Sequence, residues 1–324
     1  MKIAYLHGEN DFAVEFTRQL RATLPQQEIL AWRRGETAPV HDLDLLISVG
    51  EVGRRQLADQ PKLALIQTAS TGYENVDIDF ASEFGIWVSN APSDVTGNAT
   101  SVAEFAVLLL LGTSRHLGEE LECLRDPEIK PSRLNPALSG KTICIVGLGH
   151  IGRQLVDRLR PFGVKIAATD EHPERAPEDV TAFPADQLLK AVALADYVVL
   201  CVPASKENDH LINASVIRAM KHGAILVNVA RGMLIDEGAL LAAVKDGQIS
   251  AAGLDVLQKE PPDPENPLTR FPQVLITPHI AGATDLMLSG TVNYIAQVVE
   301  EFAAGKKPKS ILNTPQKPRW PLQA

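Results

Sequence analysis

The sequence predicts an α/β protein made of two domains, each built around a mostly parallel sheet. Its length of 324 residues exceeds one ordinary core and suits two domains of about 150 residues each. Short apolar runs alternate with helical stretches, which is the pattern of parallel strands joined by crossover helices. The runs form two successive series without a fixed-period repeat. Two similar domains are therefore expected rather than one large sheet.

The strands of both series are predicted from short apolar runs. The runs of the first series are KIAYLHG, DLLISVG, LALIQTAS and IWVSNAP. The runs of the second series are TICIVGLG, VKIAATD, YVVLCVP, AILVNVA, ISAAGLDV and VLITPHI.

Two long helices are predicted at the borders of the second series. Ser101 and Glu104 fit a capping box before an apolar run, which predicts a long, largely buried helix suited to domain packing or dimerisation. A second helix is expected over Asp285–Ala304, ended by Gly305 and Pro308. Its inner face would hold Val292, Ile295, Val299 and Phe302. Because it follows the last strand, this helix is expected to return the chain to the first domain.

These borders predict a discontinuous first domain. We expect residues 1–98 and 286–324 to form one domain and residues 99–285 the other. The tail Thr314–Ala324 contains three prolines, so we expect it to be an extended strap or disordered.

Charge and hydropathy exclude several classes of function. The net charge is −9, and no basic run is longer than the two residues of Lys306–Lys307, so we expect no nucleic acid and no anionic membrane as a partner. The longest apolar run, Phe105 to Leu111, is far shorter than the roughly 20 residues of a membrane span. The N-terminus has polar residues where a signal peptide would be apolar. The 3 cysteines lack metal-ligand spacing. We therefore expect that the protein binds no metal. We also expect it to be located in the cytoplasm.

The second series opens with a glycine-rich turn that predicts a dinucleotide site. In ICIVGLGHIGRQLV, an apolar strand runs into Gly147, Gly149 and Gly152, and a helix follows. Gly147 permits the tight turn, Gly149 admits a pyrophosphate and Gly152 lets the helix pack on the strand. Asp170 ends the next strand about 20 residues on, where a carboxylate would bind the adenosine ribose. NAD is expected. NADP remains a less favoured alternative because Arg175 follows closely.

Three further segments follow later strands, at the edge where such sheets bind ligands. They place Arg231 in VNVARG, Glu260 in GLDVLQKEPP and His279 in ITPHIAG. Arginine matches a carboxylate, histidine can donate and accept a proton near neutrality, and a carboxylate beside it favours the imidazolium. Taken singly, each could be an ordinary loop or surface residue. Together they predict hydride transfer to a small 2-keto acid.

The motifs resemble the D-isomer-specific 2-hydroxyacid dehydrogenase family, which includes glyoxylate/hydroxypyruvate reductases and phosphoglycerate dehydrogenases. The resemblance covers roughly Leu63 to Gly282. It is carried by STGYENVDID, SNAP, SVAEFAVLLLL, VGLGHIG, VNVARGMLIDEGAL, AAGLDV, KEPP and TPHIAG.

The resemblance implies two Rossmann/flavodoxin-like domains that close over the substrate in a cleft between them, and a homodimer with the long helix from Ser101 in its contact. It implies that Arg231 binds and polarises the substrate, that His279 is the acid/base with Glu260 as its partner, and that Ser70, Thr71 and Gly72 bind the substrate carboxylate. The implied cofactor residues are Gly147, Gly149, His150, Ile151, Gly152, Asp170, Val202, Pro203, Val229, Ala230, Arg231, Asp255, His279 and Gly282.

Three alternatives stay open beside this interpretation. Formate oxidation needs no proton transfer. Formate dehydrogenases that resemble this chain have glutamine at the position of Glu260, so Glu260 disfavours this alternative. A phosphite-oxidising relative would keep all three polar residues. A non-enzymatic, NAD-sensing corepressor on the same scaffold would show no turnover. The sequence does not select one 2-hydroxy acid.

Overall fold

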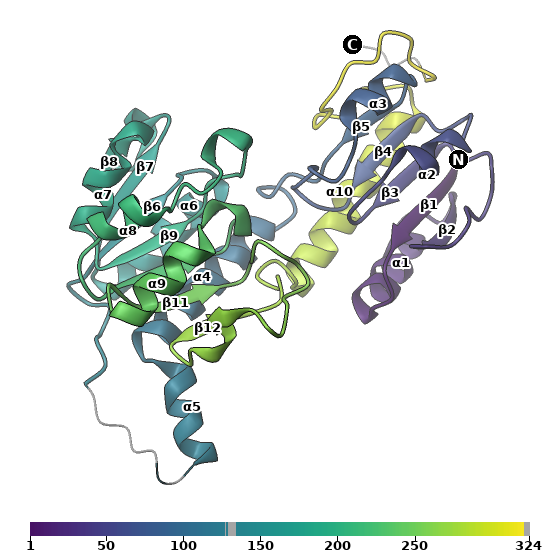
Figure 1. The fold of residues 1–324 in the computed structure, drawn as a ribbon. Helices are drawn as coiled ribbons and strands as arrows, with labels where there is room; N and C mark the ends of the chain where they lie inside the picture. The colour runs from purple at the N-terminus through teal and green to yellow at the C-terminus, as the bar shows by residue number, and fades with distance from the viewer. Residues whose placement is uncertain (127, 129–133, 321–324) are drawn as a thin grey trace. The chain divides into compact units, whose positions relative to one another are not determined.

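The computed structural model describes residues 1–126, 128 and 134–320. The chain divides into two compact units, Met1–Asn98 with Thr284–Ala324, and Ala99–Ala283 (Figure 1). Each unit contains one all-parallel sheet. The α/β class and the two parallel sheets predicted from the sequence are confirmed.

The smaller unit, the first in the chain, has a five-stranded sheet in the order β2-β1-β3-β4-β5, the flavodoxin-like order. Helices α1 and α10 cover one face of this sheet, and α2 and α3 cover the other. Its elements are β1 (Lys2–His7), α1 (Asp11–Thr23), β2 (Glu28–Arg33), β3 (Leu45–Ser48), α2 (Arg54–Ala58), β4 (Leu65–Thr68), α3 (Ile78–Glu83), β5 (Trp87–Ser89) and α10 (Asp285–Ala303).

The larger unit has a seven-stranded sheet in the order β12-β11-β10-β9-β6-β7-β8. Helices α4 and α6 pack on one face, and α7, α8 and α9 on the other. Its elements are α4 (Asn98–Ser114), α5 (Leu117–Arg125), β6 (Thr142–Val146), α6 (His150–Leu159), β7 (Lys165–Asp170), β8 (Val180–Pro184), α7 (Leu188–Leu194), β9 (Tyr197–Leu200), α8 (Ala214–Ala219), β10 (Ala224–Asn228), α9 (Glu237–Asp246), β11 (Ile249–Leu254) and β12 (Val274–Ile276).

One strand in each sheet was not predicted from the sequence. Both missed strands, β2 and β8, lie at the edge of their sheets. Their residues alternate or mix buried and exposed positions, whereas β3, β4, β9 and β10 are buried throughout. Edge strands have one free side and often a solvated face. Strands β2 and β8 therefore lack the continuous apolar run that predicted the others, the edge strands β5 and β12 among them.

The predicted capping box at Ser101 is wrong. Helix α4 begins at Asn98, so Ser101 lies inside its first turns and is 3% exposed. Gly97, with φ +74°, turns the chain into the helix four residues before the cap expected at Ser101. Glu104 is exposed and pairs with Arg158 on α6 at 3.4 Å instead of capping the helix.

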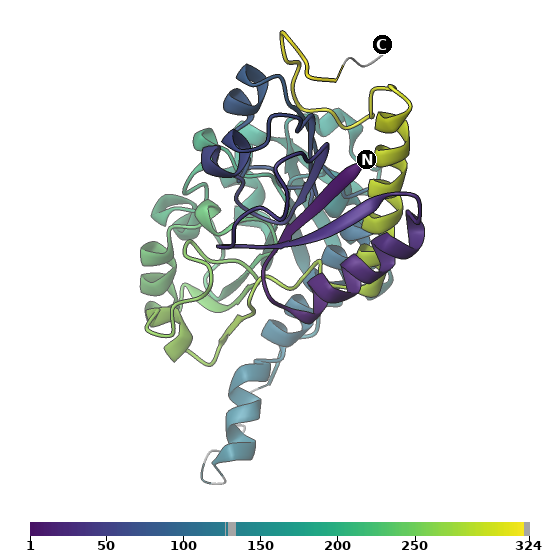
Figure 2. The ribbon, with the colours of Figure 1, turned by 90° about the vertical axis from the view of Figure 1, so that its right-hand side faces the viewer.

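Helix α10 returns the chain to the smaller unit, as predicted. It packs beside α1, and the four residues assigned to its inner face are buried (Figure 2). The start of α10 touches the end of the first segment. A Cβ on Gly290 would lie 2.4 Å from the carbonyl oxygen of Thr96, and one on Gly97 would lie 2.7 Å from Leu286 Cγ. The two chain segments of this unit therefore meet at their junction.

The segment after α10 is an extended strap over β5. Leu312 N–H donates to Val88 O at 2.8 Å, and Ile311 forms an antiparallel bridge with Ser89. Trp320 stacks on Phe302 with ring centroids 5.4 Å apart. The strap predicted for the tail is thus found as far as residue 320, and residues 321–324 lie outside the described part.

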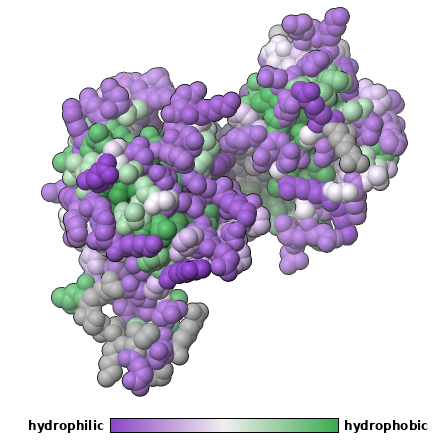
Figure 3. Space-filling view, in the orientation of Figure 1, coloured by the Kyte–Doolittle hydropathy of each residue, from purple (hydrophilic) through white to green (hydrophobic). Residues whose placement is uncertain are grey.

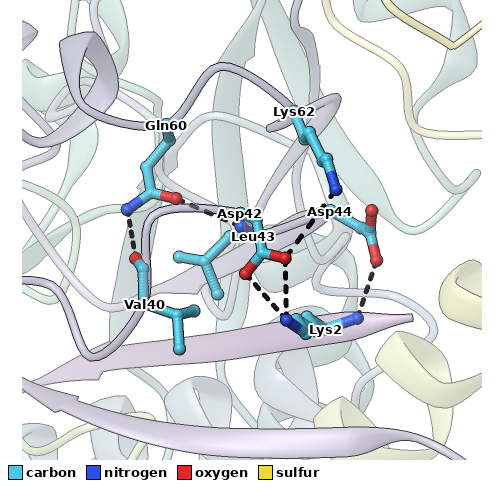
Figure 4. Close-up of polar contacts among 7 residues, drawn as sticks. All are labelled: Lys2, Val40, Asp42, Leu43, Asp44, Gln60 and Lys62. Carbon is cyan, nitrogen blue, oxygen red and sulfur yellow. Dashed lines mark hydrogen bonds and ion pairs between the residues drawn. The ribbon is translucent and has the colours of Figure 1, made fainter.

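A polar cluster fixes the amino edge of the first sheet (Figure 4). Lys2 donates from Nζ to Asp42 Oδ2 at 2.7 Å and from its backbone to Asp44 Oδ2 at 2.7 Å. The Gln60 side chain bridges Leu43 N and Val40 O at 3.1 and 2.6 Å. The hydrogen bond from Lys2 lowers the pKa of Asp42. These contacts hold the segment before β3 against the start of β1.

Most of the surface in the view of Figure 3 is hydrophilic. Among the described helices, none combines the length and apolar character that a bilayer crossing requires. Within the same residues, no group of three or more His, Cys, Asp or Glu side chains is arranged to hold a metal ion.

Candidate active site

The glycine turn lies where the strand order of the larger sheet reverses. Strands β7 and β8 continue on one side of β6, and β9 to β12 on the other. A Cβ on Gly147, which has φ +97°, would lie 2.9 Å from Val202 N, and one on Gly152 would lie 2.1 Å from Gly147 O. Around Gly149, a Cβ would meet nothing within 4 Å. The loop is thus closed toward the protein and open above Gly149, which fits a pyrophosphate at the start of α6.

Asp170 ends β7 beside this turn. Its Oδ2 accepts the N–H of Leu148 at 2.7 Å, and its Oδ1 accepts the N–H of His172 at 2.8 Å. The carboxylate therefore lies at the glycine loop, where the ribose contact was predicted, and it also orders the loop backbone.

The other predicted cofactor residues follow the carboxyl ends of the strands. His150 and Ile151 begin α6, and Ile151 is partly buried. The remaining residues are Val202 and Pro203 after β9, Val229 and Ala230 after β10, Asp255 after β11, and Gly282 after β12. The topology therefore brings every predicted cofactor segment to one edge of the sheet.

Arg231 is held by a turn after β10 that the sequence analysis did not single out. Asn228 is fully buried; its Oδ1 accepts Ala230 N–H at 3.0 Å and its Nδ2 donates to Arg231 O at 2.9 Å. The Arg231 guanidinium donates from Nη1 to Ala230 O at 2.8 Å. A polar residue closing an otherwise apolar strand, as Asn228 does, is the signal that could have revealed this turn.

His279 and Glu260 form a direct pair. His279 Nδ1 lies 2.7 Å from Glu260 Oε2, and their side chains are 48% and 35% exposed. A carboxylate can only accept, so Nδ1 carries the proton and donates it. The opposite nitrogen, Nε2, is then the one available for proton exchange with a ligand.

The charges around this pair favour the imidazolium. The hydrogen bond that His279 donates to Glu260 raises the pKa of His279 above its ordinary value, against burial and the nearby positive charge of Arg231. Partial burial opposes ionisation of Glu260, but the hydrogen bond and charge of His279 outweigh it and lower the pKa of Glu260. Arg231 acts electrostatically on both groups. The three residues predicted as catalytic are therefore electrostatically coupled at one edge of the sheet.

Asp255 anchors the turn that carries His279. It is 2% exposed. Its Oδ1 accepts Thr277 Oγ1–H at 2.7 Å and Ile280 N–H at 2.9 Å, and its Oδ2 accepts Ala281 N–H at 2.9 Å. His279 itself has φ +56°, a conformation unfavourable for a non-glycine residue. The buried carboxylate thus fixes a strained backbone, a role that sequence reasoning missed when it assigned Asp255 only to the cofactor.

The predicted substrate loop lies in the smaller unit. Thr68 Oγ1 donates to Ser70 O at 2.8 Å, Asn90 Nδ2 donates to Thr71 O at 2.8 Å, and Ser70 Oγ donates to Gly72 O at 2.8 Å. The carbonyl groups of the loop are thus all held by side chains, which fixes its conformation.

The strand order reverses beside a glycine turn, and an acidic residue ends the second strand. A histidine–carboxylate pair lies on the same edge of the sheet. Together these features define a dehydrogenase that uses a nicotinamide dinucleotide. Comparison with known proteins identifies the family. Residues 107–281 match the family model described as D-isomer specific 2-hydroxyacid dehydrogenase, NAD binding domain. The chain belongs to this family, and it is an oxidoreductase that acts on CH–OH groups with NAD or NADP.

Relatives that match most of this chain support the same assignment. The chain is 35% identical to a glyoxylate reductase from Thermococcus litoralis over 307 residues, covering 88% of this chain and 90% of that one. It is 34% identical to a D-3-phosphoglycerate dehydrogenase from Methanocaldococcus jannaschii over 287 residues, covering 87% of this chain. The match spans 54% of that relative, about half of its length.

A solved structure matches the whole chain. The NADPH-dependent glyoxylate/hydroxypyruvate reductase from Sinorhizobium meliloti, solved with citrate, superimposes with a TM-score of 0.84 at 28% identity, covering 100% of both chains. The same protein has also been solved with NADP and malonate.

Proposed function

We propose that this protein reduces a small 2-keto acid to the D-2-hydroxy acid with NADH, and catalyses the reverse oxidation. The observation that carries the proposal is the 2.7 Å contact between His279 Nδ1 and Glu260 Oε2 within the electrostatic reach of Arg231. Formate oxidation would have no use for this pair, because it transfers no proton.

Each of the three side chains has a distinct task in the proposed reaction. Arg231 binds the substrate carboxylate through its planar guanidinium and polarises the carbonyl oxygen. His279 delivers a proton from Nε2 to that oxygen, and takes it back in the oxidation. Glu260 holds Nδ1 and stabilises the imidazolium that the reduction requires. Bound NADH supplies the hydride to the second carbon of the acid.

We propose that the cofactor lies along the edge formed by the glycine turn. Gly147, Gly149 and Gly152 would admit the pyrophosphate to the start of α6, and Asp170 would bind the adenosine ribose. A carboxylate at this position repels a 2′-phosphate, which favours NAD over NADP. Arg175, with a side chain 67% exposed, is the residue that would support NADP.

The unit Met1–Asn98 with Thr284–Ala324 is proposed as the substrate domain, and Ala99–Ala283 as the cofactor domain. Ser70, Thr71 and Gly72 would present backbone N–H groups to the substrate carboxylate. The support is the fixed conformation of this loop, which lowers the entropy cost of binding.

Glyoxylate and hydroxypyruvate are the first substrates to test, because relatives that match nearly the whole chain are described as reductases of these acids. The assay follows NADH or NADPH absorbance with glyoxylate, hydroxypyruvate, pyruvate, phenylpyruvate and phosphohydroxypyruvate. Turnover of at least one acid supports the proposal. No turnover of any acid, with NADH bound, would favour a cofactor-sensing protein.

The role of His279 is tested by His279→Ala. We expect a loss of about a hundredfold or more in kcat, the range of general acid catalysis, with unchanged NADH affinity measured by fluorescence titration. His222→Ala serves as the matched control, because His222 is exposed at the opposite, amino edge of the sheet. Wild-type rates in His279→Ala would remove the acid/base assignment.

We also propose a homodimer with α4 and α5 in the contact. Helix α5 projects from the larger unit (Figure 1) and exposes Leu117, Leu121 and Leu124 by 41%, 45% and 81%. Their spacing of four and three residues puts them on one side of the helix. Leu108 on α4 is also 54% exposed. Light scattering would measure the oligomeric state, and Leu121→Glu should shift it toward monomer.

A cytoplasmic location is proposed as well. Cys144 and Cys201 are buried free thiols, and Cys123 is a partly buried one. Free thiols are usual in reducing compartments. Fractionation of the native cells would test this location.

A further inference from the structure

The loop that carries Glu260 is long, exposed and proline-rich. It runs from Leu257 to Asn266 between β11 and the short 3₁₀ helix Pro267–Arg270. The side chains of Lys259 and Glu265 are 75% and 83% exposed. Leu257 at its start is buried in the core, but none of residues 258–265 is buried, so this part has little apolar packing of its own to hold Glu260 at 2.7 Å from His279. Other contacts must fix its position.

One carboxylate, that of Glu237, binds both ends of this loop. Its Oε1 accepts the backbone N–H of Gln258 at 2.7 Å, and its Oε2 accepts from Asn266 Nδ2 at 2.9 Å. Glu237 is the first residue of α9, and Asp236, not Glu237, caps that helix by accepting Ala239 N–H. The helix therefore does not need the Glu237 side chain for its own start, and both oxygens serve the loop.

The start of the loop also packs against the segment of Arg231. A Cβ on Gly232 would lie 2.0 Å from the carbonyl carbon and oxygen of Leu257, so backbone meets backbone there. Gln258 Nε2 donates to Ile235 O at 2.8 Å, and lies 2.8 Å from His210 Nε2. The loop is thus fastened to the 3₁₀ turn after Arg231 and to the first turn of α9.

We propose that Glu237 is a positioning residue that holds Glu260 in hydrogen-bond contact with His279. His279 is held separately, by the Asp255 turn. Two segments held by different contacts must therefore stay in register for the pair to form, and Glu237 fixes the position of the loop. This inference rests on the proposed function, in which the pair performs the proton transfer.

The hydrogen bonds of Glu237 define a reciprocal test. In Glu237→Gln, the new amide nitrogen would face Asn266 Nδ2, so two hydrogen-bond donors would oppose each other. In Asn266→Asp, a carboxylate would face the Glu237 carboxylate while Oδ1 still accepts Leu268 N–H, so the 3₁₀ cap is kept. The double variant exchanges donor and acceptor, so the new amide at position 237 can donate to the new carboxylate at position 266. Its oxygen can still accept from Gln258.

The first readout is the titration of His279 in the ligand-free protein by NMR of labelled histidine, assigned with His279→Gln. The charged groups that act on this imidazole are Glu260, Asp255 and Arg231. We expect each single variant to lower the pKa of His279, because Glu260 moves away, and the double variant to restore it. A structural role alone would not produce this pattern.

The second readout is catalysis. Each single variant should lower kcat by about tenfold or more, since small displacements of catalytic groups are costly, and should lower the pH at which reduction declines. The double variant should recover most of both. Glu265→Gln, in the same loop and paired with exposed Arg270 at 3.2 Å, is the control and should behave as wild type.

Three results would overturn the proposal: an unchanged His279 pKa in both single variants, no recovery in the double variant, or an equal effect of Glu265→Gln. If the wild type reduces no 2-keto acid, the proposed function fails. The titration still tests the positioning by Glu237 in that case, so the two failures are distinguishable.

Discussion

Asp255→Asn tests whether the buried carboxylate holds the His279 turn. The asparagine keeps one oxygen for Thr277 and Ile280, but its amide group would face Ala281 N–H, which lies 2.9 Å from Oδ2 in the native protein. One hydrogen bond to a charged group, worth about 1.5–3 kcal/mol, is lost. Ala281 is 3% exposed, so its N–H loses its acceptor where water cannot easily replace it. We expect a total destabilisation of about 2–4 kcal/mol.

The assay is thermal unfolding followed by far-UV circular dichroism. At about 2–4 °C per kcal/mol for a domain of 150–250 residues, the variant should melt roughly 5–15 °C below the wild type. Thr277→Val removes a single hydroxyl donor and should cost less. Asp186→Asn, the same substitution at an exposed position of this unit, should not change the melting temperature. A melting temperature of Asp255→Asn within about 2 °C of wild type would refute the reasoning.

Three further substitutions test the site. Arg231→Lys should lower kcat/KM for the keto acid by about a hundredfold or more, because an ammonium lacks the fork that pairs with a carboxylate; steady-state kinetics measures it. Glu260→Gln should lower the pH at which reduction declines, since Glu260 raises the pKa of His279 and reduction needs the protonated imidazole; an unchanged profile of kcat/KM against pH contradicts this. Asp170→Asn should raise KM for NADH about tenfold, the cost of one hydrogen bond to a charged group. It should also lower the ratio of kcat/KM for NADH to kcat/KM for NADPH.

The fold was predictable wherever a strand is buried on both faces. Runs such as TICIV and AILVN form β6 and β10 because a central parallel strand is buried on both faces and is therefore mostly apolar. The edge strands β2 and β8 gave no such signal. The start of α4 was misplaced because Ser101 and Glu104 have the spacing of a cap, whereas a left-handed glycine, Gly97, begins the helix.

The candidate site was predictable for residues that follow buried strands. Arg231 and His279 each lie three residues beyond a strand end, so the topology itself brings them to one edge. The residues that support them were not predictable. Glu237 looks like an ordinary acidic residue in the first turn of a helix, and its contacts with a loop some 20 to 30 residues away depend on tertiary packing. Asp255 was assigned to a ligand, because no local pattern shows that its carboxylate is turned toward the backbone.

The contact between Thr96 and Gly290 has a practical consequence for dissecting the protein. Since the chain leaves the smaller unit and re-enters it at neighbouring points, a short linker from residue 98 to residue 284 could replace everything between them. The outcome would be a single continuous miniature protein with the five-stranded sheet, α10 and the strap. Affinity of the loop at residues 70–72 for simple carboxylates could then be measured without competition from the cofactor half.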